Sequence, residues 1–168
     1  YNKGELIQPN PDMSLTWDYV YMMGLEVDAD EFYDFMRLFL VCHADHEGGN
    51  VSAFTSLTVN SALSDLYYSV SAGFNGLAGP LHGLANQESI SWILELMKKY
   101  GGSPTKEQVE EYVAATLNSG KVVPGYGHAV LRIVDPRFDA IYNFGQKYCS
   151  DDEVFKTVKT IFEVVPGQ

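Results

Sequence analysis

The chain has 168 residues, of which 46% are hydrophobic and 20% are charged, a composition typical of a globular protein. Its net charge of −11 argues against a nucleic-acid-binding surface, which needs a basic face, so we expect no nucleic-acid partner. No segment approaches the roughly 20 consecutive apolar residues of a membrane-spanning helix, so we expect no membrane span.

The first part of the chain predicts two helices. One covers residues 15–23 and would end at Gly24. Asp28 and Glu31 have the spacing of a capping box, and apolar side chains then recur at helical spacing over residues 32–40. The second helix would therefore begin just after Asp28.

Three further helices are expected in the middle of the chain. Residues 50–64 and 66–79 are rich in Ser, Ala, Thr and Gly, whose small side chains let helices approach closely. We expect this pair to be buried against other helices. A longer helix over residues 83–100 has an apolar stripe and would end at the two glycines that follow it.

A second capping box, formed by Thr105 and Gln108, predicts the next helix, which would end near Asn118. Residues 121–134 cannot form a regular helix because Pro124, Gly125 and Gly127 interrupt them. The end of this segment, residues 130–134, is the one extended stretch that the pattern favours.

The last part of the chain predicts two more helices. Asp135 followed by Pro136 is typical of a helix start, and this helix would run to about Tyr148. Ser150 and Glu153 form a third capping box before the final apolar stripe. The predicted fold class is therefore all-α.

Histidines are the main candidates for chemistry. His46 belongs to a glycine-rich segment, His82 lies between glycines just before a helix, and His128 follows Gly125-Tyr126-Gly127. Glycine lets the backbone approach a ligand closely, which exposes main-chain donors and acceptors beside the imidazole. A structural role as an ordinary surface or core residue suits His43 better than the other three.

A metal site is the alternative interpretation of one cluster. His43, His46 and Glu47 have ligand chemistry, and the two histidines are three residues apart. No second cluster completes a ligand set, and Cys42 and Cys149 have no Cys-x-x-Cys spacing. We therefore expect no metal.

Three long motifs, taken together, resemble the citrate synthase family. They are HEGGNVSA with SALSD (residues 46–53 and 61–65), NGLAGPLHGLANQE (residues 75–88), and VVPGYGHAVLR followed by DPR (residues 122–132 and 135–137). The motifs stand in the family's order, and the His-Glu-Gly-Gly-Asn form is similar to the mitochondrial eukaryotic branch. The resemblance covers essentially the whole chain, but the family's subunit is more than twice as long.

The resemblance implies a multi-helical fold of two domains. Residues 1–82 would be part of the large, dimerising domain, and residues 83–168 most of the small domain that binds coenzyme A. It also implies a homodimer in the mitochondrial matrix. The activity would be that of an acyltransferase, which condenses acetyl-coenzyme A with oxaloacetate and water to give citrate and coenzyme A. Coenzyme A would be a substrate, and no permanent cofactor is expected.

By similarity, His82 would donate a hydrogen bond to the thioester oxygen, and His128 would polarise the ketone of oxaloacetate and protonate the resulting alkoxide. The substrate-binding residues would be His46, Asn50 and Arg137, where the arginine fork suits a carboxylate. The family's general base, an aspartate, would lie beyond residue 168, so we expect this chain alone to be inactive.

The coenzyme A site is also implied by the resemblance. Main-chain groups of the segment before and after His128 would surround the adenine, and an arginine would meet a phosphate. The expected residues are Leu81, Val122, Val123, Gly125, Tyr126, Gly127, Ala129 and Arg132.

Two alternative functions remain open. A 2-methylcitrate synthase would use propionyl-coenzyme A instead, and one methylene group changes binding by only about 1–3 kcal/mol. A non-catalytic assembly or filament protein on the same fold is the other alternative. Retention of His46, His82, His128 and Arg137 together argues against lost catalysis.

Overall fold

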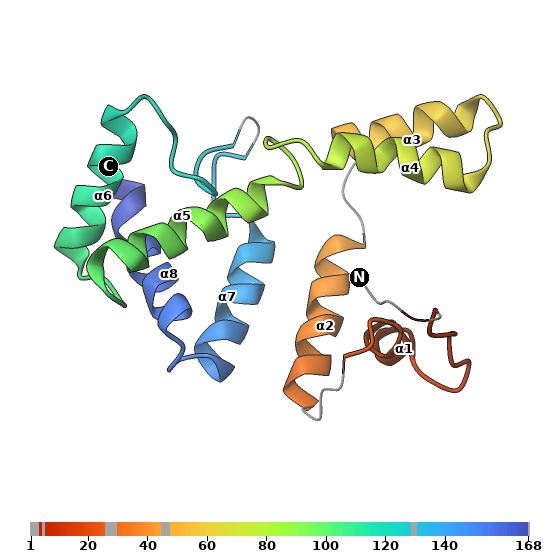
Figure 1. Cartoon of the computed structure of the whole chain (residues 1–168), viewed down its shortest axis with the longest axis horizontal. Coiled ribbons are helices and arrows are strands. Elements are labelled where there is room, and N and C mark those ends of the chain that lie inside the picture. Colours follow the sequence, from red (N-terminus) through yellow and green to blue (C-terminus); the bar gives the residue numbers. More distant parts are fainter. Residues whose placement is uncertain (1–3, 5, 26–29, 45–47, 129–130, 168) are drawn as a thin grey trace. The chain divides into compact units, whose positions relative to one another are not determined.

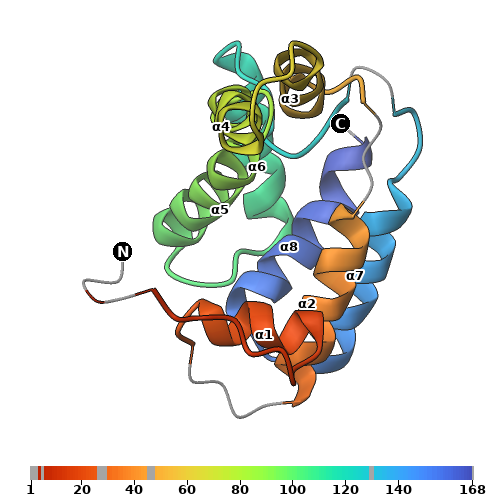
Figure 2. The same cartoon turned by 90° about the vertical axis from the view of Figure 1, so that its right-hand side faces the viewer.

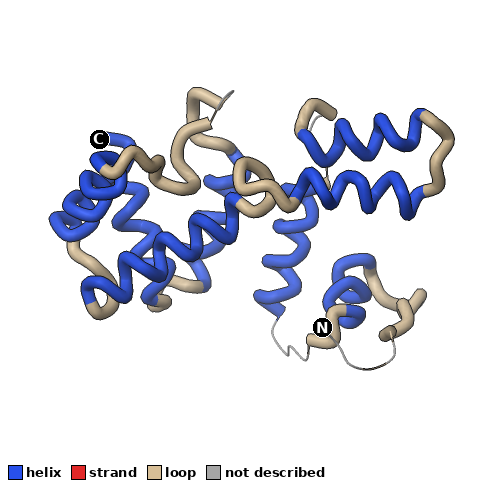
Figure 3. Tube along the Cα trace, turned by 45° about the horizontal axis from the view of Figure 1, so that its top comes forward, coloured by secondary structure: helices blue, strands red, loops and turns tan. Residues whose placement is uncertain are grey.

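The computed structural model describes residues 4, 6–25, 30–44, 48–128 and 131–167. These residues form helices, turns and loops and contain no strand (Figures 1 and 3). The helices are α1 Leu15–Met22, α2 Asp30–His43, α3 Val51–Ser61, α4 Leu66–Leu77, α5 Ala85–Tyr100, α6 Lys106–Asn118, α7 Pro136–Tyr148, α8 Glu153–Val164 and the short 3-10 helix η1 Val165–Gly167. The all-α prediction is confirmed. Over the same residues, no helix combines the length and the apolar character needed to cross a bilayer.

The chain divides into two compact units that interleave in sequence. Unit 1 consists of Tyr1–Asp45 and Val134–Tyr148, and unit 2 consists of His46–Ile133 and Cys149–Gln168. Unit 1 thus contains α1, α2 and α7, and unit 2 contains the other helices. The boundary expected after residue 82 concerns a longer subunit and stays a prediction.

In unit 1, helix α2 packs against both α1 and α7. The Trp17 ring of α1 stacks on the Tyr33 ring of α2 with the ring centroids 3.6 Å apart. Phe35 of α2 meets Phe144 of α7 at 5.4 Å between ring centroids. The predicted apolar face of α2 therefore forms the centre of this unit. Asp28, half of the first predicted capping box, lies outside the described residues, so that box stays a prediction.

In unit 2, helices α5, α6 and α8 surround an apolar core. Its buried residues are Leu96, Val109, Val113, Val123, Ile161 and Val164. The predicted capping box of α6 is confirmed, because Thr105 Oγ1 accepts from the Gln108 N–H and Gln108 Oε1 accepts from the Thr105 N–H. Helix α5 ends as expected at Gly101, whose φ of +77° suits glycine.

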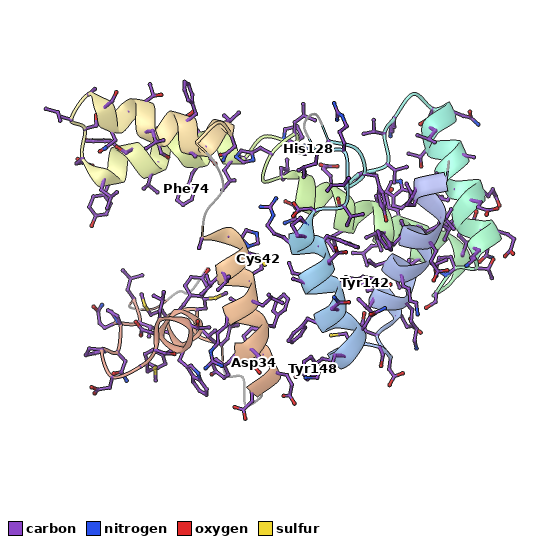
Figure 4. All side chains as sticks on the ribbon, turned by 180° about the vertical axis from the view of Figure 1, so that it is seen from behind. Asp34, Cys42, Phe74, His128, Tyr142 and Tyr148 are labelled. Carbon is purple, nitrogen blue, oxygen red and sulfur yellow. The ribbon has the colours of Figure 1, made fainter. Side chains whose placement is uncertain are left out.

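Helices α3 and α4 form an antiparallel hairpin, seen nearly end-on in Figure 2. Their close approach depends on small residues. A Cβ placed on Gly73 would lie within 2.1 Å of the Ser56 hydroxyl and 3.0 Å of the Ser52 carbonyl oxygen. The expected close approach of the two helices is confirmed, but the expected burial against other helices is not seen in this chain, because α3 has no buried residue and the two helices contact chiefly each other. Large apolar side chains, however, lie on the outside of the hairpin, as Phe74 does (Figure 4).

Two predicted helix starts differ from the structure. Helix α5 begins at Ala85 and not at residue 83, because Gly79 accepts hydrogen bonds from the His82 and Leu84 N–H groups and holds this segment in a turn. The capping box predicted for Ser150 is wrong. Asp152 caps α8 instead, and its carboxylate accepts from the Phe155 N–H at 2.8 Å.

Candidate functional site

His82 lies in the turn between α4 and α5 and is tied to the start of α3. Its Nε2 atom lies 2.8 Å from Ser52 Oγ and 3.4 Å from the Ser52 main-chain nitrogen. Ser52 Oγ in turn lies 2.9 Å from Oδ1 of Asn50. Asn50 is the N-cap of α3, and the same Oδ1 accepts from the Ala53 N–H. Polar groups at the start of α3 thus hold the Nε2 edge of the imidazole.

The hydrogen bonds of this network depend on the tautomer of a neutral imidazole, because the Ser52 hydroxyl has a single hydrogen to donate. With the proton on Nε2, His82 donates to the Ser52 hydroxyl, which then donates to Asn50. With the proton on Nδ1, Nε2 accepts from the Ser52 N–H, and the single hydroxyl hydrogen goes either to Nε2 or to Asn50 Oδ1, not to both. In the second arrangement Nδ1 can donate a hydrogen bond to a ligand oxygen.

The turn around His82 has no space for a larger residue at the next position. A Cβ placed on Gly83 would lie 2.6 Å from both the Leu77 carbonyl oxygen and a methyl carbon of Leu77. Glycine is needed here because the turn folds back against the last residue of α4. The end of α4 and the start of α3 therefore both position the His82 ring.

His128 has a defined proton arrangement. Its Nδ1 accepts a 2.9 Å hydrogen bond from the Leu131 N–H, so a neutral ring carries its proton on Nε2. The Arg132 guanidinium donates to the His128 carbonyl oxygen at 2.8 Å. Both side chains are exposed. In this tautomer Nε2–H is the hydrogen-bond donor of the ring.

The loop that precedes His128 rests on the core of unit 2. Val123 is buried in that core, and Tyr126 packs against it and donates its N–H to the Val123 carbonyl at 3.2 Å. Gly125 and Gly127 have φ values of +84° and +80°, which favour glycine. Val122 is exposed, as is Leu81 near His82. The loop thus presents main-chain groups on a fixed base.

Arg137, at the start of α7 in unit 1, forms a two-pronged pair with Asp135. Its Nε and Nη2 atoms donate to the carboxylate, and its N–H donates to Asp135 Oδ1 at 2.9 Å. The hydrogen bonds to Asp135 raise the pKa of the guanidinium, and partial burial opposes this change. The cation at a helix start is thereby compensated by a neighbouring carboxylate.

The structure links some of the predicted site residues and leaves others untested. It joins His82 to Asn50 through Ser52, a residue for which no sequence pattern indicated a role in the site. It also joins His128 to Arg132. His46 and Ala129 lie outside the described residues, so their predicted roles stay predictions. The convergence of His46, His82 and His128 on one ligand stays a prediction as well.

Metal binding gains no support from the described residues, which contain no group of three or more His, Cys, Asp and Glu side chains that could hold an ion. His43 instead makes a 2.7 Å contact from Nδ1 to the Phe39 carbonyl and stacks on the Phe39 ring. His46 and Glu47 lie outside the residues that the structure describes, so the possible metal cluster of His43, His46 and Glu47 stays untested.

Comparisons with known proteins agree on one family. Residues 1–168 match the family described as "Citrate synthase, C-terminal domain". The chain is 54% identical over 155 residues to a protein of Glossina morsitans morsitans named "Probable citrate synthase, mitochondrial", covering 92% of the chain and 33% of that protein. It spans about a third of the length of the curated relatives it matches.

Solved structures give the same result. The crystal structure of citrate synthase from Thermotoga maritima matches with a TM-score of 0.80 and 27% identity, over 97% of this chain and 43% of that one. The structure of citrate synthase from Thermoplasma acidophilum in a ternary complex matches with a TM-score of 0.76 and 25% identity, over 94% of this chain and 41% of that one. The chain therefore belongs to the citrate synthase family.

Proposed function

We propose that this chain is part of a citrate synthase, which condenses acetyl-coenzyme A with oxaloacetate and releases citrate and coenzyme A. The observation that carries the proposal is the contact between the Ser52 N–H and Nε2 of His82, because an Nε2 that accepts leaves Nδ1 of the imidazole as a donor. The matching solved enzyme from Thermoplasma acidophilum is described as a complex with carboxymethyl coenzyme A and oxaloacetate, which supports this substrate pair.

Two histidines would take part directly in the reaction. Nδ1–H of His82 would donate to the thioester oxygen and stabilise the enolate formed when the methyl group loses a proton. Nε2–H of His128 would donate to the ketone oxygen, which becomes an alkoxide as the carbon–carbon bond forms, and would then protonate it. The general base is expected beyond residue 168, and water would cleave the thioester of the condensed product.

The resemblance assigns further residues to substrate binding. His46 and Arg137 would hold the carboxylates of oxaloacetate, and Asn50 would also contribute to substrate binding. Main-chain groups of residues 122–129 would receive the adenine of coenzyme A, and Arg132 would meet a phosphate. The fixed base of this loop on Val123 and Tyr126 supports that role.

A thiol-release assay tests the proposed function. The full-length protein that carries this chain should release coenzyme A only when both acetyl-coenzyme A and oxaloacetate are present. The 168-residue chain alone should show no turnover above background, because the expected general base is missing. Absence of thiol release by the full-length protein would overturn the proposal. Faster turnover with propionyl-coenzyme A would favour the 2-methylcitrate synthase alternative.

Replacing Ser52 with alanine should lower kcat of the full-length protein roughly five- to tenfold, because a single hydrogen bond to the ring contributes about 1 kcal/mol. The main-chain contact from Ser52 to Nε2 remains in this variant, so the loss should be smaller than for removal of the ring itself. Steady-state kinetics provides the measurement, with Ser71, exposed on α4, changed to alanine as a control. Equal kcat values for the two variants would contradict the role of Ser52.

We also propose that the protein is a homodimer through the α3–α4 hairpin. Leu57, Leu66 and Phe74 are 60%, 71% and 63% exposed on this hairpin, and such a concentration of apolar surface is typical of an interface. Sedimentation should show that Phe74→Asp weakens the dimer at least roughly tenfold. The matched control Leu94→Asp on α5 should leave it intact. A monomeric wild-type protein at micromolar concentration would overturn this proposal.

We propose that the protein acts in the mitochondrial matrix. The curated relatives are named as mitochondrial citrate synthases, which supports the mitochondrial matrix as the site of action. A non-catalytic assembly protein would not need the polar chain behind His82, so this alternative is less favoured. We propose that residues 1–82 belong to the large domain of the subunit and residues 83–168 to its small domain.

A further inference from the structure

The loop expected to receive coenzyme A is supported at three points within unit 2. Val123 is inserted in the core, and Tyr126 packs half-buried against that core. Between them, Gly125 lies over Ser89 of α5: a Cβ placed on Gly125 would be 3.0 Å from Ser89 Oγ and 3.8 Å from Ser89 Cβ. The third support is therefore a side chain of helix α5 and not a residue of the loop itself.

Ser89 connects two parts of the proposed site. Helix α5 begins at Ala85, directly after the turn that carries His82, so Ser89 lies in the second turn of that helix. The Ser89 side chain is half-buried beneath the loop. The Ser89 side chain thus faces Gly125 of the loop from the helix that follows the His82 turn.

We propose that Ser89 is a positioning residue for the loop of residues 122–128, and that its small side chain sets the height of Gly125 above α5. This inference rests on the proposed function. A larger side chain at position 89 would raise the loop's main-chain groups relative to His82, and small misplacements of binding groups are costly. Ser89 would act through the loop, without touching the substrate.

Kinetics and binding in the full-length protein test this role. Ser89→Leu should raise the Kd for coenzyme A and the KM for acetyl-coenzyme A at least about fivefold, a change that corresponds to about 1 kcal/mol. The KM for oxaloacetate and the Tm should change little. Ser89→Ala should behave like wild type, and the control Ser91→Leu, at an exposed position of the same helix, should leave both constants unchanged.

A double-mutant cycle gives an independent measurement of the same contact. Gly125→Ala should weaken coenzyme A binding more in the wild-type background than in the Ser89→Ala background, where the crowding atom 3.0 Å away is gone. The strain from the positive φ of Gly125 affects both backgrounds equally and cancels.

The outcomes separate this inference from the proposed function. A wild-type protein that does not bind coenzyme A overturns the proposed function and the role of Ser89 with it. A wild-type protein that binds coenzyme A, together with unchanged binding in Ser89→Leu or no coupling in the cycle, overturns the role of Ser89 alone. An equal rise in the KM for oxaloacetate also overturns it, because it indicates general damage.

Discussion

Replacing His82 with alanine in the full-length protein should lower kcat by roughly 10²- to 10⁴-fold, the range typical of a group that moves or shares a proton in the transition state. The imidazole would stabilise negative charge that develops on the thioester oxygen, so its loss should affect kcat more than the KM for oxaloacetate. Initial rates of thiol release, measured over a grid of both substrate concentrations, provide the test.

A second histidine provides a control for this experiment. His43 is exposed at the end of α2, where its ring stacks on Phe39 and contacts the Phe39 carbonyl. His43→Ala should keep kcat within about twofold, because this ring is held by its own helix and has no task in the proposed reaction. If His82→Ala kept its kcat within the same limits, the proposed role of His82 would be wrong.

The fold should survive the loss of the His82 ring. Ser52 can still donate to Asn50, and Asn50 still accepts from the Ala53 N–H, so the only hydrogen bond that the helix start loses is the long 3.4 Å contact from the Ser52 N–H. The turn from Gly79 to Ala85 is held by main-chain hydrogen bonds that do not involve the ring. An unchanged circular dichroism spectrum and Tm would therefore accompany the loss of turnover.

Helices were predictable from the sequence where their signals are local. The Thr105–Gln108 capping box and the glycine after α5 act within a few residues of the helix ends, so the pattern alone indicates them. The predicted cap of α8 was wrong because Ser150 and Asp152 are both good N-cap residues. Only the hydrogen bond from the Phe155 N–H to Asp152 distinguishes them.

The candidate site was predictable only in part. Glycines around His82 and His128 indicated positions where backbone and ligand could approach, but no local pattern indicated that Ser52 contacts a ring 30 residues later in the chain. That contact depends on the packing of α3 against α4. The contact of Ser89 with the loop at Gly125 likewise depends on tertiary structure.

The outward apolar surface of the hairpin shows a further limit of sequence patterns. Two helices rich in small residues were expected to be buried, and the small residues do lie between the helices. The large residues, among them Leu66 and Phe74, lie on the opposite faces. A period of 3.6 residues indicates that a helix has two different faces, but it does not indicate which face meets the nearest neighbour.

Replacing Gly73 with leucine should destabilise the full-length protein by about 2–3 kcal/mol, the usual cost of forcing extra atoms into a packed contact. Helix propensity alone predicts the opposite sign, because glycine is about 1 kcal/mol less favourable than alanine within a helix. The steric cost should exceed the gain in helix propensity, since the added side chain would meet the Ser56 hydroxyl and the main-chain oxygen of Ser52. Thermal unfolding provides the measurement.

The same substitution should also reduce turnover in the fraction that remains folded. Ser52 meets Gly73 with its carbonyl oxygen and His82 with its N–H and hydroxyl, so moving α3 away from α4 moves the support of the ring. Ser91→Leu, at an exposed position of α5 outside the hairpin, is the control and should change neither property. Gly73→Ala should cost less, because it adds a single methyl group and the Ser56 hydroxyl that this group would meet can rotate away. The Ser52 carbonyl oxygen cannot move in this way, so some loss of stability should remain. If Gly73→Leu were as stable and as active as the control, the hairpin contact would not be what positions His82.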